Sequence, residues 1–588
     1  MLSLFLASKI ATVISYAALV YSLGTTCTTP IGRGTAAPAS PFWMQNIKHQ
    51  GIAAFNPNST TYQVFRNVKD FCAKGDGITD DTVAIKYVGA TLCAAISAGN
   101  RCGGGLCPSS TTTPAVVFFP LGKYVISAPI IAYYYTQLIG DANFPPTLLA
   151  APNFGGIAVI DADPYIATGQ FYDNTNNFFR SVRNFTIDLT QIPATSSAGT
   201  GIHWQVAQAK SLMNIVINMS ADPNTAHQGL VMENGRKNWN VGRKPTLGIG
   251  QLKVFDPLSP PTYSSYKGWT FQAVTFNNCS IGFDISTGGG PPQPVAAEAI
   301  IDATALNTLS SSGPPPTVRR RSACWWNDDN YLMGPAGGAI VVEWNVKQTT
   351  QGGAGMWDSH IRLGGGTVWF QLKVSCSDRN SKLPERISKP RFAHRTEVVG
   401  TWVWLADHDL DEPGGGQDQV SIYSARGILS ESAGPVWLIG TASEHHVLYQ
   451  YNLANAKSHY MGLIQTETPY FQPNPVAPVP FTVNTAFKDP ASWSDISQAW
   501  GLWVTSSDDI LVFGAALYSF YSNYDQGCLT PVNCQSQIVN VDNESSVDIY
   551  SLSTIGTTWQ LSINQVPLIN QDQNLNGFAS TVTSWSSS

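Results

Sequence analysis

The stretch "RSVRNFTIDLT" (residues 180–190) decides the fold class. It is a short run of β-forming residues that ends in a polar corner, and "SLMNIVINMS" (211–220) repeats the same plan. Further runs follow it: "GGIAVIDA" (155–162), "WTFQAVTFNNCSIGFDIS" (269–286) and "EAIIDATALNT" (298–308). Short buried strands with sharp polar corners, repeated as coils, are typical of a right-handed parallel β-helix. A β-sandwich would have similar strands, but more Asn-Gly hairpin turns than this chain contains.

The same pattern returns in the second half of the chain, from "GGAIVVEWNV" (337–346) onward. Between the two sets, "GGGPPQP" (288–294) and "SSSGPPPTVRRRSACWWNDDN" (310–330) interrupt it. We therefore predict an all-β chain made of two β-helix domains in tandem. The expected boundaries are 40–284 for the N-terminal β-helix, 285–335 for an irregular junction and 336–588 for the C-terminal β-helix.

Composition narrows the possible partners. The formal net charge of the 588 residues is −6, so the chain has no basic field that would attract nucleic acid. It contains 17 Trp and 22 Tyr, and such rings stack well on the apolar faces of sugars. A neutral carbohydrate is the partner that this composition favours.

The N-terminus indicates secretion. Residues 1–24 have Lys9 before an apolar run from Ile10 to Leu23, which is too short to span a membrane comfortably and is typical of a signal peptide. No later segment reaches spanning length, so we expect a secreted, extracellular protein without a membrane partner.

An oxidising compartment agrees with the ten cysteines, because short loops place Cys102 near Cys107 and Cys528 near Cys534, as in local disulfides. Five sequons would permit N-glycosylation: Asn58, Asn184, Asn218, Asn278 and Asn543.

Several motifs, taken in order, resemble one enzyme family. They are "FRNVKDFCAKGDGITDDT" (65–82), "YYYTQLIGD" (133–141), "TGIHWQVAQA" (200–209), "GMWDSHIRLGG" (355–365), "VWLADHDLD" (403–411), "GTASEHHVLYQYNLANAK" (440–457) and "IQTETPYFQPNP" (464–475). The chain resembles glycoside hydrolase family 55, which comprises secreted, mainly fungal β-1,3-glucanases. The resemblance implies two tandem right-handed parallel β-helices packed side by side, with the substrate cleft between them and inverting, mostly exo-acting hydrolysis of β-1,3-glucan.

The chain departs from the family in two places. The Gly-Asp-Gly-x-Thr-Asp-Asp segment that opens each domain of the family occurs once, at Gly75–Asp81, so we expect the second β-helix to lack its first coils. Residues 236–267 also fail to follow the family, where another coil is expected.

Glu467 in "TETPY" is the predicted general acid. Inverting hydrolysis needs an acid that protonates the leaving oxygen and a base that activates water on the opposite face. Burial beside Tyr470 and Phe471 would keep Glu467 protonated near the working pH. The resemblance assigns the acid to this Glu and places Tyr470 at the same subsite. The alternative is an exposed loop glutamate.

Glu444 is the second candidate carboxylate, since it precedes Glu467 by about one coil and both would face one groove if the coils stack in register. It would hold the attacking water directly or through a polar chain. Alternatively, it is a structural residue paired with His445 or His446. These two histidines point to opposite faces of a strand, so we expect packing or sugar contacts from them rather than a metal site.

Other residues are candidates for the cleft. Gln205 and Gln208 resemble the family segment that supplies amides to the attacking water, although glutamines also occur at β-helix corners. The candidates for sugar binding are Asp358, Asp407, Asp409, Trp404, Trp437 and Tyr460, for which turn and core roles are the alternatives.

We expect a monomer without cofactor or metal. Two other functions remain open: a pectin-type polysaccharide lyase, and a shortened family member that only binds glucan.

Overall fold

The computed structural model describes residues 42–587 apart from internal gaps. The gaps are 54–55, 87–93, 99–100, 102–106, 108, 168, 173–176, 206–208, 223, 235–236, 244–245, 256–267, 278–280, 285–297, 302–303, 307–329, 332–341, 345–354, 365–389, 393–395, 409, 412–418, 420–421, 492–497 and 577–578. The predicted signal peptide (1–24), Cys102, Gln208, Asn278 and Asp409 lie outside the described residues.

The N-terminal half is built from two sheets between which the chain passes alternately. The spine of the larger, 12-stranded sheet consists of β1 (Phe65–Asn67), β3 (Ala115–Phe119), β6 (Thr136–Gly140), β11 (Arg180–Asp188) and β13 (Lys210–Asn218), and β2 (Asp76–Asp80), β4 (Lys123–Ile126) and β7 (Thr147–Ala150) pair beside it. The smaller sheet contains β5 (Ile130–Ile131), β8 (Ile160–Asp161), β12 (Thr200–Gln205) and β14 (Gln228–Asn234). All of these neighbours pair in parallel.

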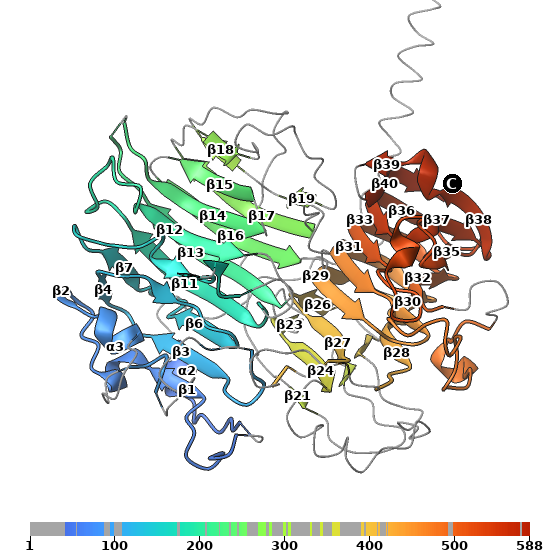
Figure 1. Cartoon of the computed structure of the whole chain (residues 1–588), viewed down its shortest axis with the longest axis horizontal. Coiled ribbons are helices and arrows are strands. Elements are labelled where there is room, and N and C mark those ends of the chain that lie inside the picture. Colours follow the sequence, from blue (N-terminus) through green and yellow to red (C-terminus); the bar gives the residue numbers. More distant parts are fainter. Residues whose placement is uncertain are drawn as a thin grey trace, which may run out of the picture.

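The C-terminal half repeats this arrangement with sheets of 11 and 9 strands (Figure 1). Its larger sheet contains β24 (His360–Gly364), β27 (Trp402–Ala406), β29 (Val436–Glu444), β31 (Lys457–Glu467), β33 (Asp508–Tyr518) and β36 (Val547–Ile555), with β23 (Gly355–Trp357) and β26 (Thr396–Val399) alongside. Its smaller sheet contains β25 (Pro390–Phe392), β28 (Arg426–Ser430), β30 (Tyr449–Ala454), β32 (Trp500–Thr505), β35 (Val539–Val541) and β37 (Thr557–Ile563). The predicted pair of parallel β-helices is thus confirmed.

Left-handed residues form the corners of the coils. Asn184 in β11 and Asn214 in β13 have φ values of 63° and 51°, a conformation that Asn tolerates better than most side chains. The Asn214 amide donates to the Asn184 side chain (3.0 Å), and the Asn184 amide donates to the Gly140 carbonyl (3.0 Å), so the corner side chains form a ladder. In the other half the corners fall at Asp358, Gly400, Gly440, Leu463, Gly514 and Ser551.

One part of the N-terminal β-helix is not parallel. β15 (Lys237–Arg243) runs antiparallel to β14, β16 (Thr246–Phe255) antiparallel to β13, and β17 (Gly268–Asn277) antiparallel to β16. For β14 and β15 the physical reason is the length of the connection. Only residues 235–236 separate β14 from β15, and a parallel crossover needs about a dozen residues or more. The sequence departs from the family in this region, and the strands described there, β15 and β16, run antiparallel to β14 and β13.

Strands continue beyond this reversal into the predicted junction. β19 (Glu298–Ile301) and β20 (Thr304–Leu306) pair in parallel with β17, and β21 (Asn330–Tyr331) pairs with β24 of the other half. The boundaries of the junction stay a prediction.

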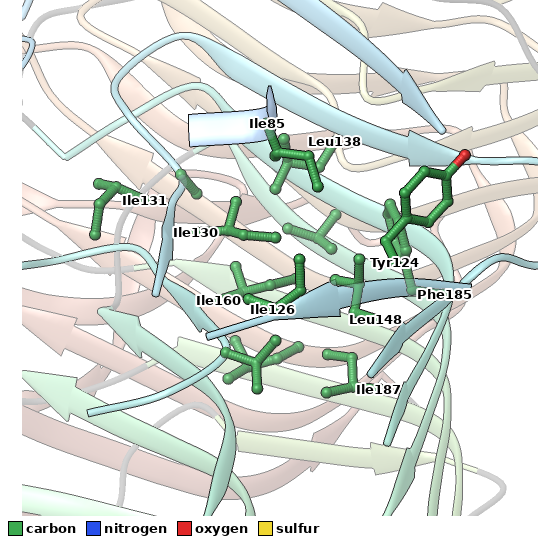
Figure 2. Close-up of a cluster of buried hydrophobic side chains, with 14 of the residues drawn as sticks. Ile85, Tyr124, Ile126, Ile130, Ile131, Leu138, Leu148, Ile160, Phe185 and Ile187 are labelled. Atoms are coloured by element: carbon green, nitrogen blue, oxygen red, sulfur yellow. The ribbon is translucent and has the colours of Figure 1, made fainter. Parts of the chain in front are cut away.

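Apolar side chains fill the inside of each β-helix. In the N-terminal one, Ile126 and Leu148 of the larger sheet meet Ile160 of the smaller sheet in one core (Figure 2). Each such side chain contributes about 1.5–3 kcal/mol by leaving water. The short helix α3 (Thr82–Lys86) adds Ile85 to this core. No helix among the described residues is long and apolar enough to cross a membrane.

The two β-helices contact each other side by side (Figure 1). Asp358 of the C-terminal half accepts hydrogen bonds from Ser211 (2.8 Å) and Ser181 (3.3 Å), and its carboxylate lies 3.3 Å from the Arg183 guanidinium. Asp411 binds the backbone N–H (2.7 Å) and the hydroxyl (2.5 Å) of Thr111. An aromatic cluster joins the halves as well: Tyr134, Tyr135, Tyr172, Phe178, Phe179, Trp402 and Trp404.

One predicted disulfide is formed, between Cys528 and Cys534. Cys72 and Cys107 each take part in a disulfide as well.

Candidate active site

Glu444 and Glu467 end two neighbouring strands of the larger C-terminal sheet. The parallel ladder of β29 and β31 pairs Glu444 directly with Glu467, so both side chains leave the same face of the sheet. The exposed fractions are 2% for Glu444 and 1% for Glu467. Stacking in register one coil apart, as the spacing predicts, therefore brings the two candidate carboxylates together.

The two oxygens of Glu467 have different surroundings. Oε2 accepts the Tyr470 hydroxyl at 2.7 Å and lies 3.5 Å from Nε2 of His445. Oε1 is buried and has no hydrogen-bond partner among the residues that the structure describes. One oxygen is thus anchored, whereas the other is left for a group that is not part of the described chain.

Glu444 is held from the opposite direction. Its Oε2 accepts the indole N–H of Trp402 (2.8 Å), and its Oε1 accepts the side-chain amide of Gln465 (3.2 Å). Both donors precede the Glu444–Glu467 pair along their strands, whereas Tyr470 follows it. The two carboxylates are therefore anchored from opposite sides of the pair along the strand direction.

His445 and His446 occupy different environments. Nδ1 of His445 lies 3.2 Å from Asp407 and 3.1 Å from the Leu405 carbonyl. The ring of His446 contacts the Ser424 hydroxyl at 3.0 Å. No group of three His, Cys, Asp or Glu in the described part of the chain is arranged to hold a metal ion.

Charge pairing dominates the electrostatics of the site. Burial alone would raise the pKa of Asp407, but His445 and His408 hold it well below its usual value. Burial would lower the pKa of His445, yet the carboxylates of Asp407 and Glu467 raise it well above the usual value. Burial lowers the pKa of His446 to about 3, so this ring is neutral. The site holds one cationic imidazole between two carboxyl groups.

A tyrosine rim beside Glu467 was not predicted. The ring of Tyr521 lies tilted against that of Tyr470 with centroids 4.2 Å apart, and the backbone N–H of Tyr524 donates to the Tyr470 carbonyl (2.8 Å). Tyr524 is 42% exposed. Partial burial of the ring, together with the negative charge of Asp407, raises the pKa of Tyr524 to about 12. The sequence "FYSNYD" (520–525) could have indicated it, because this segment begins two residues after Tyr518, which pairs with Glu467 in the ladder.

The remaining candidates lie at different depths of the molecule. Trp404 stacks on Trp402 with centroids 4.2 Å apart, next to Glu444 in the ladder. Trp437 pairs with Tyr460 in the ladder of β29 and β31, on the N-terminal side of the corners at Gly440 and Leu463. Both side chains pack against an apolar cluster between the β-helices, which consists of Met213, Trp357, Val399 and Ile439. Their proposed stacking on sugar stays a prediction.

Asp407 joins the carboxylates through His445, whereas Asp358 lies in the contact between the two halves. Gln205 ends β12, and its amide lies 3.5 Å from the Tyr172 carbonyl. Its Oε1 has no hydrogen-bond partner among the described residues.

Comparison with known proteins identifies the family. Residues 65–290 match the family described as rhamnogalacturonase A/epimerase, pectate lyase-like. A probable glucan endo-1,3-beta-glucosidase of Arthroderma benhamiae is 30% identical over 92% of this chain and 95% of its own length. The glucan 1,3-beta-glucosidase of Cochliobolus carbonum is 27% identical over 94% of each chain. A protein of Penicillium expansum named non-secreted LysM effector LysM15 is 30% identical over 94% of this chain and 52% of its own.

The Arthroderma alignment runs over 848 positions, whereas this chain has 588 residues, so the relative carries long segments without a counterpart here. Even so, the likeness extends over nearly the whole of both chains and over both β-helices. The protein is therefore a glycoside hydrolase and belongs to family 55.

Proposed function

We propose that this protein hydrolyses β-1,3-glucan from the chain end with inversion, with Glu467 as general acid and without a cofactor. The names of the relatives support the substrate. The observation that carries the mechanism is the buried Oε1 of Glu467, which has no partner among the described residues while Oε2 is anchored by Tyr470. A proton on Oε1 passes to the glycosidic oxygen as the bond to the anomeric carbon breaks.

Glu444 is the residue through which we propose that water is activated. An inverting pair needs roughly 6.5–9.5 Å between carboxyl groups, whereas adjacent strands lie about 4.8 Å apart. We propose that the two carboxyl groups stand farther apart than the strands, because Trp402 and Gln465 hold Glu444 from one side and Tyr470 holds Glu467 from the other. The amide of Gln205, at the end of a strand in the other β-helix, is the candidate for orienting the water.

We also propose that the protein is secreted, on the strength of the predicted signal peptide and the disulfide between Cys528 and Cys534. Since one relative is named non-secreted, N-terminal sequencing of protein from the culture medium is the direct test. Chain recovered only inside cells with residues 1–24 still attached would contradict secretion.

The test of function is hydrolysis of laminarin followed by proton NMR. We expect glucose to appear first as the α-anomer with the wild-type chain, and the rate to fall by about 10²-fold or more in Glu467→Gln. The exposed Glu544 supplies the matched control, because Glu544→Gln removes a carboxylate in a remote loop and should leave the rate unchanged.

Three outcomes would each overturn part of the proposal. First release as the β-anomer would refute inversion. Internal oligosaccharides as first products would refute attack from the chain end. Binding of laminarin without cleavage by a folded wild-type chain would favour a binding protein, consistent with the segments that it lacks relative to the Arthroderma protein.

A further inference from the structure

His445 lies between two carboxylates and makes five contacts that fix its position. Its backbone N–H donates to the Glu467 carbonyl (2.9 Å), and its ring lies beside that of Tyr470, with centroids 4.4 Å apart. Nδ1 meets Asp407 and Nε2 meets Glu467. The residue also has φ of 67°, which is unusual for a histidine and marks a conformation that the surroundings impose.

The protonation of Nδ1 follows from its partners. The Leu405 carbonyl, 3.1 Å away, can only accept a hydrogen bond, so Nδ1 carries hydrogen. Asp407, at 3.2 Å on the same nitrogen, strengthens this requirement. Nε2 is then the only nitrogen whose proton can change.

Nε2 faces Oε2 of Glu467 at 3.5 Å, and the Tyr470 hydroxyl already donates to that oxygen. When the proton of Glu467 is on Oε1, Oε2 can accept from both Tyr470 and a protonated Nε2. When the proton of Oε1 has left, the same two donors stabilise the resulting carboxylate. The arrangement therefore serves both states of a general acid that uses Oε1.

We propose that His445 is a positioning residue of this enzyme: an imidazolium that links Asp407 to Glu467, holds Oε2, and stabilises the carboxylate formed when Oε1 gives its proton to the glycosidic oxygen. This inference rests on the proposed role of Glu467. The charged or titratable groups that surround the pair are Asp407 and His408 after β27, Glu444 and His446 around the end of β29, Tyr470 after β31, and Tyr521 and Tyr524 after β33.

The first experiment measures the protonation state of His445 by NMR and does not depend on enzymatic activity. In protein labelled with ¹⁵N-histidine, one of the nine histidines should stay cationic at pH 8, and its signal should be absent from His445→Gln. Glu467→Gln should make this histidine lose its proton at a lower pH. A spectrum in which every histidine is neutral at pH 8 would overturn the proposal, whether or not the chain cleaves laminarin.

The second experiment measures kcat/KM for laminarin against pH. His445→Gln removes the positive charge beside the reacting group, so the pH above which activity falls should move upward by about one unit or more. The value of kcat should fall as well. The matched control is His446→Gln, which removes the neighbouring neutral ring and should leave that pH unchanged.

A fall in kcat with an unmoved pH profile would mean that His445 is only structural and would overturn the inference. A wild-type chain that does not cleave laminarin at all would instead refute the proposed function, and the histidine spectrum would still decide the charge of His445.

Discussion

Asp358 provides the sharpest test of how the two β-helices are held together. Its carboxylate is 2% exposed and receives Ser211, Ser181 and the Arg183 guanidinium from the N-terminal half. In Asp358→Asn the side chain keeps its shape, but the guanidinium loses its buried counter-charge. Breaking one side of a buried ion pair costs about 3–5 kcal/mol. Arg183 retains contacts with Ser181 (3.1 Å) and Gln137 (3.4 Å), so we expect the lower end, about 3 kcal/mol.

Denaturant unfolding, followed by both circular dichroism and tryptophan fluorescence, measures this loss and shows whether it falls in one transition. The companion variant Asp358→Asn with Arg183→Met removes both charges and keeps a residue that tolerates the left-handed conformation at 358, so it should be more stable than Asp358→Asn alone because no unpaired charge stays buried. A loss below about 1 kcal/mol in Asp358→Asn, or a double variant that is less stable than it, would refute the reasoning.

Three further predictions concern single side chains. Asn214→Ala breaks the corner ladder and leaves an alanine in the left-handed conformation. The free energy of unfolding should therefore fall by about 1–3 kcal/mol. A variant as stable as the wild type would contradict the role of the ladder. Tyr524→Ala should raise KM for laminarin several-fold while Tyr524→Phe does not, and the equally exposed Tyr550→Ala is the control; an unchanged KM would remove Tyr524 from the substrate path. Burial raises the pKa of Asp163 to about 7, so folding binds a proton there between about pH 4 and pH 7, and the stability that this group confers is lost as the pH rises through that window. In thermal unfolding, Asp163→Asn should therefore raise the Tm relative to wild type more at pH 8 than at pH 5. A larger increase at pH 5 would contradict the raised pKa of Asp163.

The repeated strands were predictable because they depend on neighbouring residues only. The corners were expected at the polar ends of "RSVRNFTIDLT" and "SLMNIVINMS", whereas the left-handed residues Asn184 and Asn214, which form the ladder, lie inside these runs. The spacing of Glu444 and Glu467 was equally informative, because coils of similar length bring residues one coil apart into the same column.

Contacts between the two halves could not be predicted in this way. Asp358 reads as a turn aspartate in the sequence, and only the docking of the β-helices brings it to Arg183 and the two serines. Trp437 and Tyr460 look like stacking platforms, but whether they meet sugar or Met213 depends on the packing between the halves. Tyr524 was missed because its place beside Tyr470 comes through a hydrogen bond between two separate loops.

The pairing of Glu444 with Glu467 on consecutive rungs has a consequence for how such proteins change in length. Each rung of a β-helix touches mainly the rungs above and below it, so whole coils elsewhere can be gained or lost over evolutionary time without moving these two carboxylates. The loss of a single residue between them would be far more harmful, because it would turn one side chain to the other face of the sheet. Length variation in this lineage should therefore come in complete turns, and the interval between the two glutamates should be the part of the gene where insertions are least tolerated.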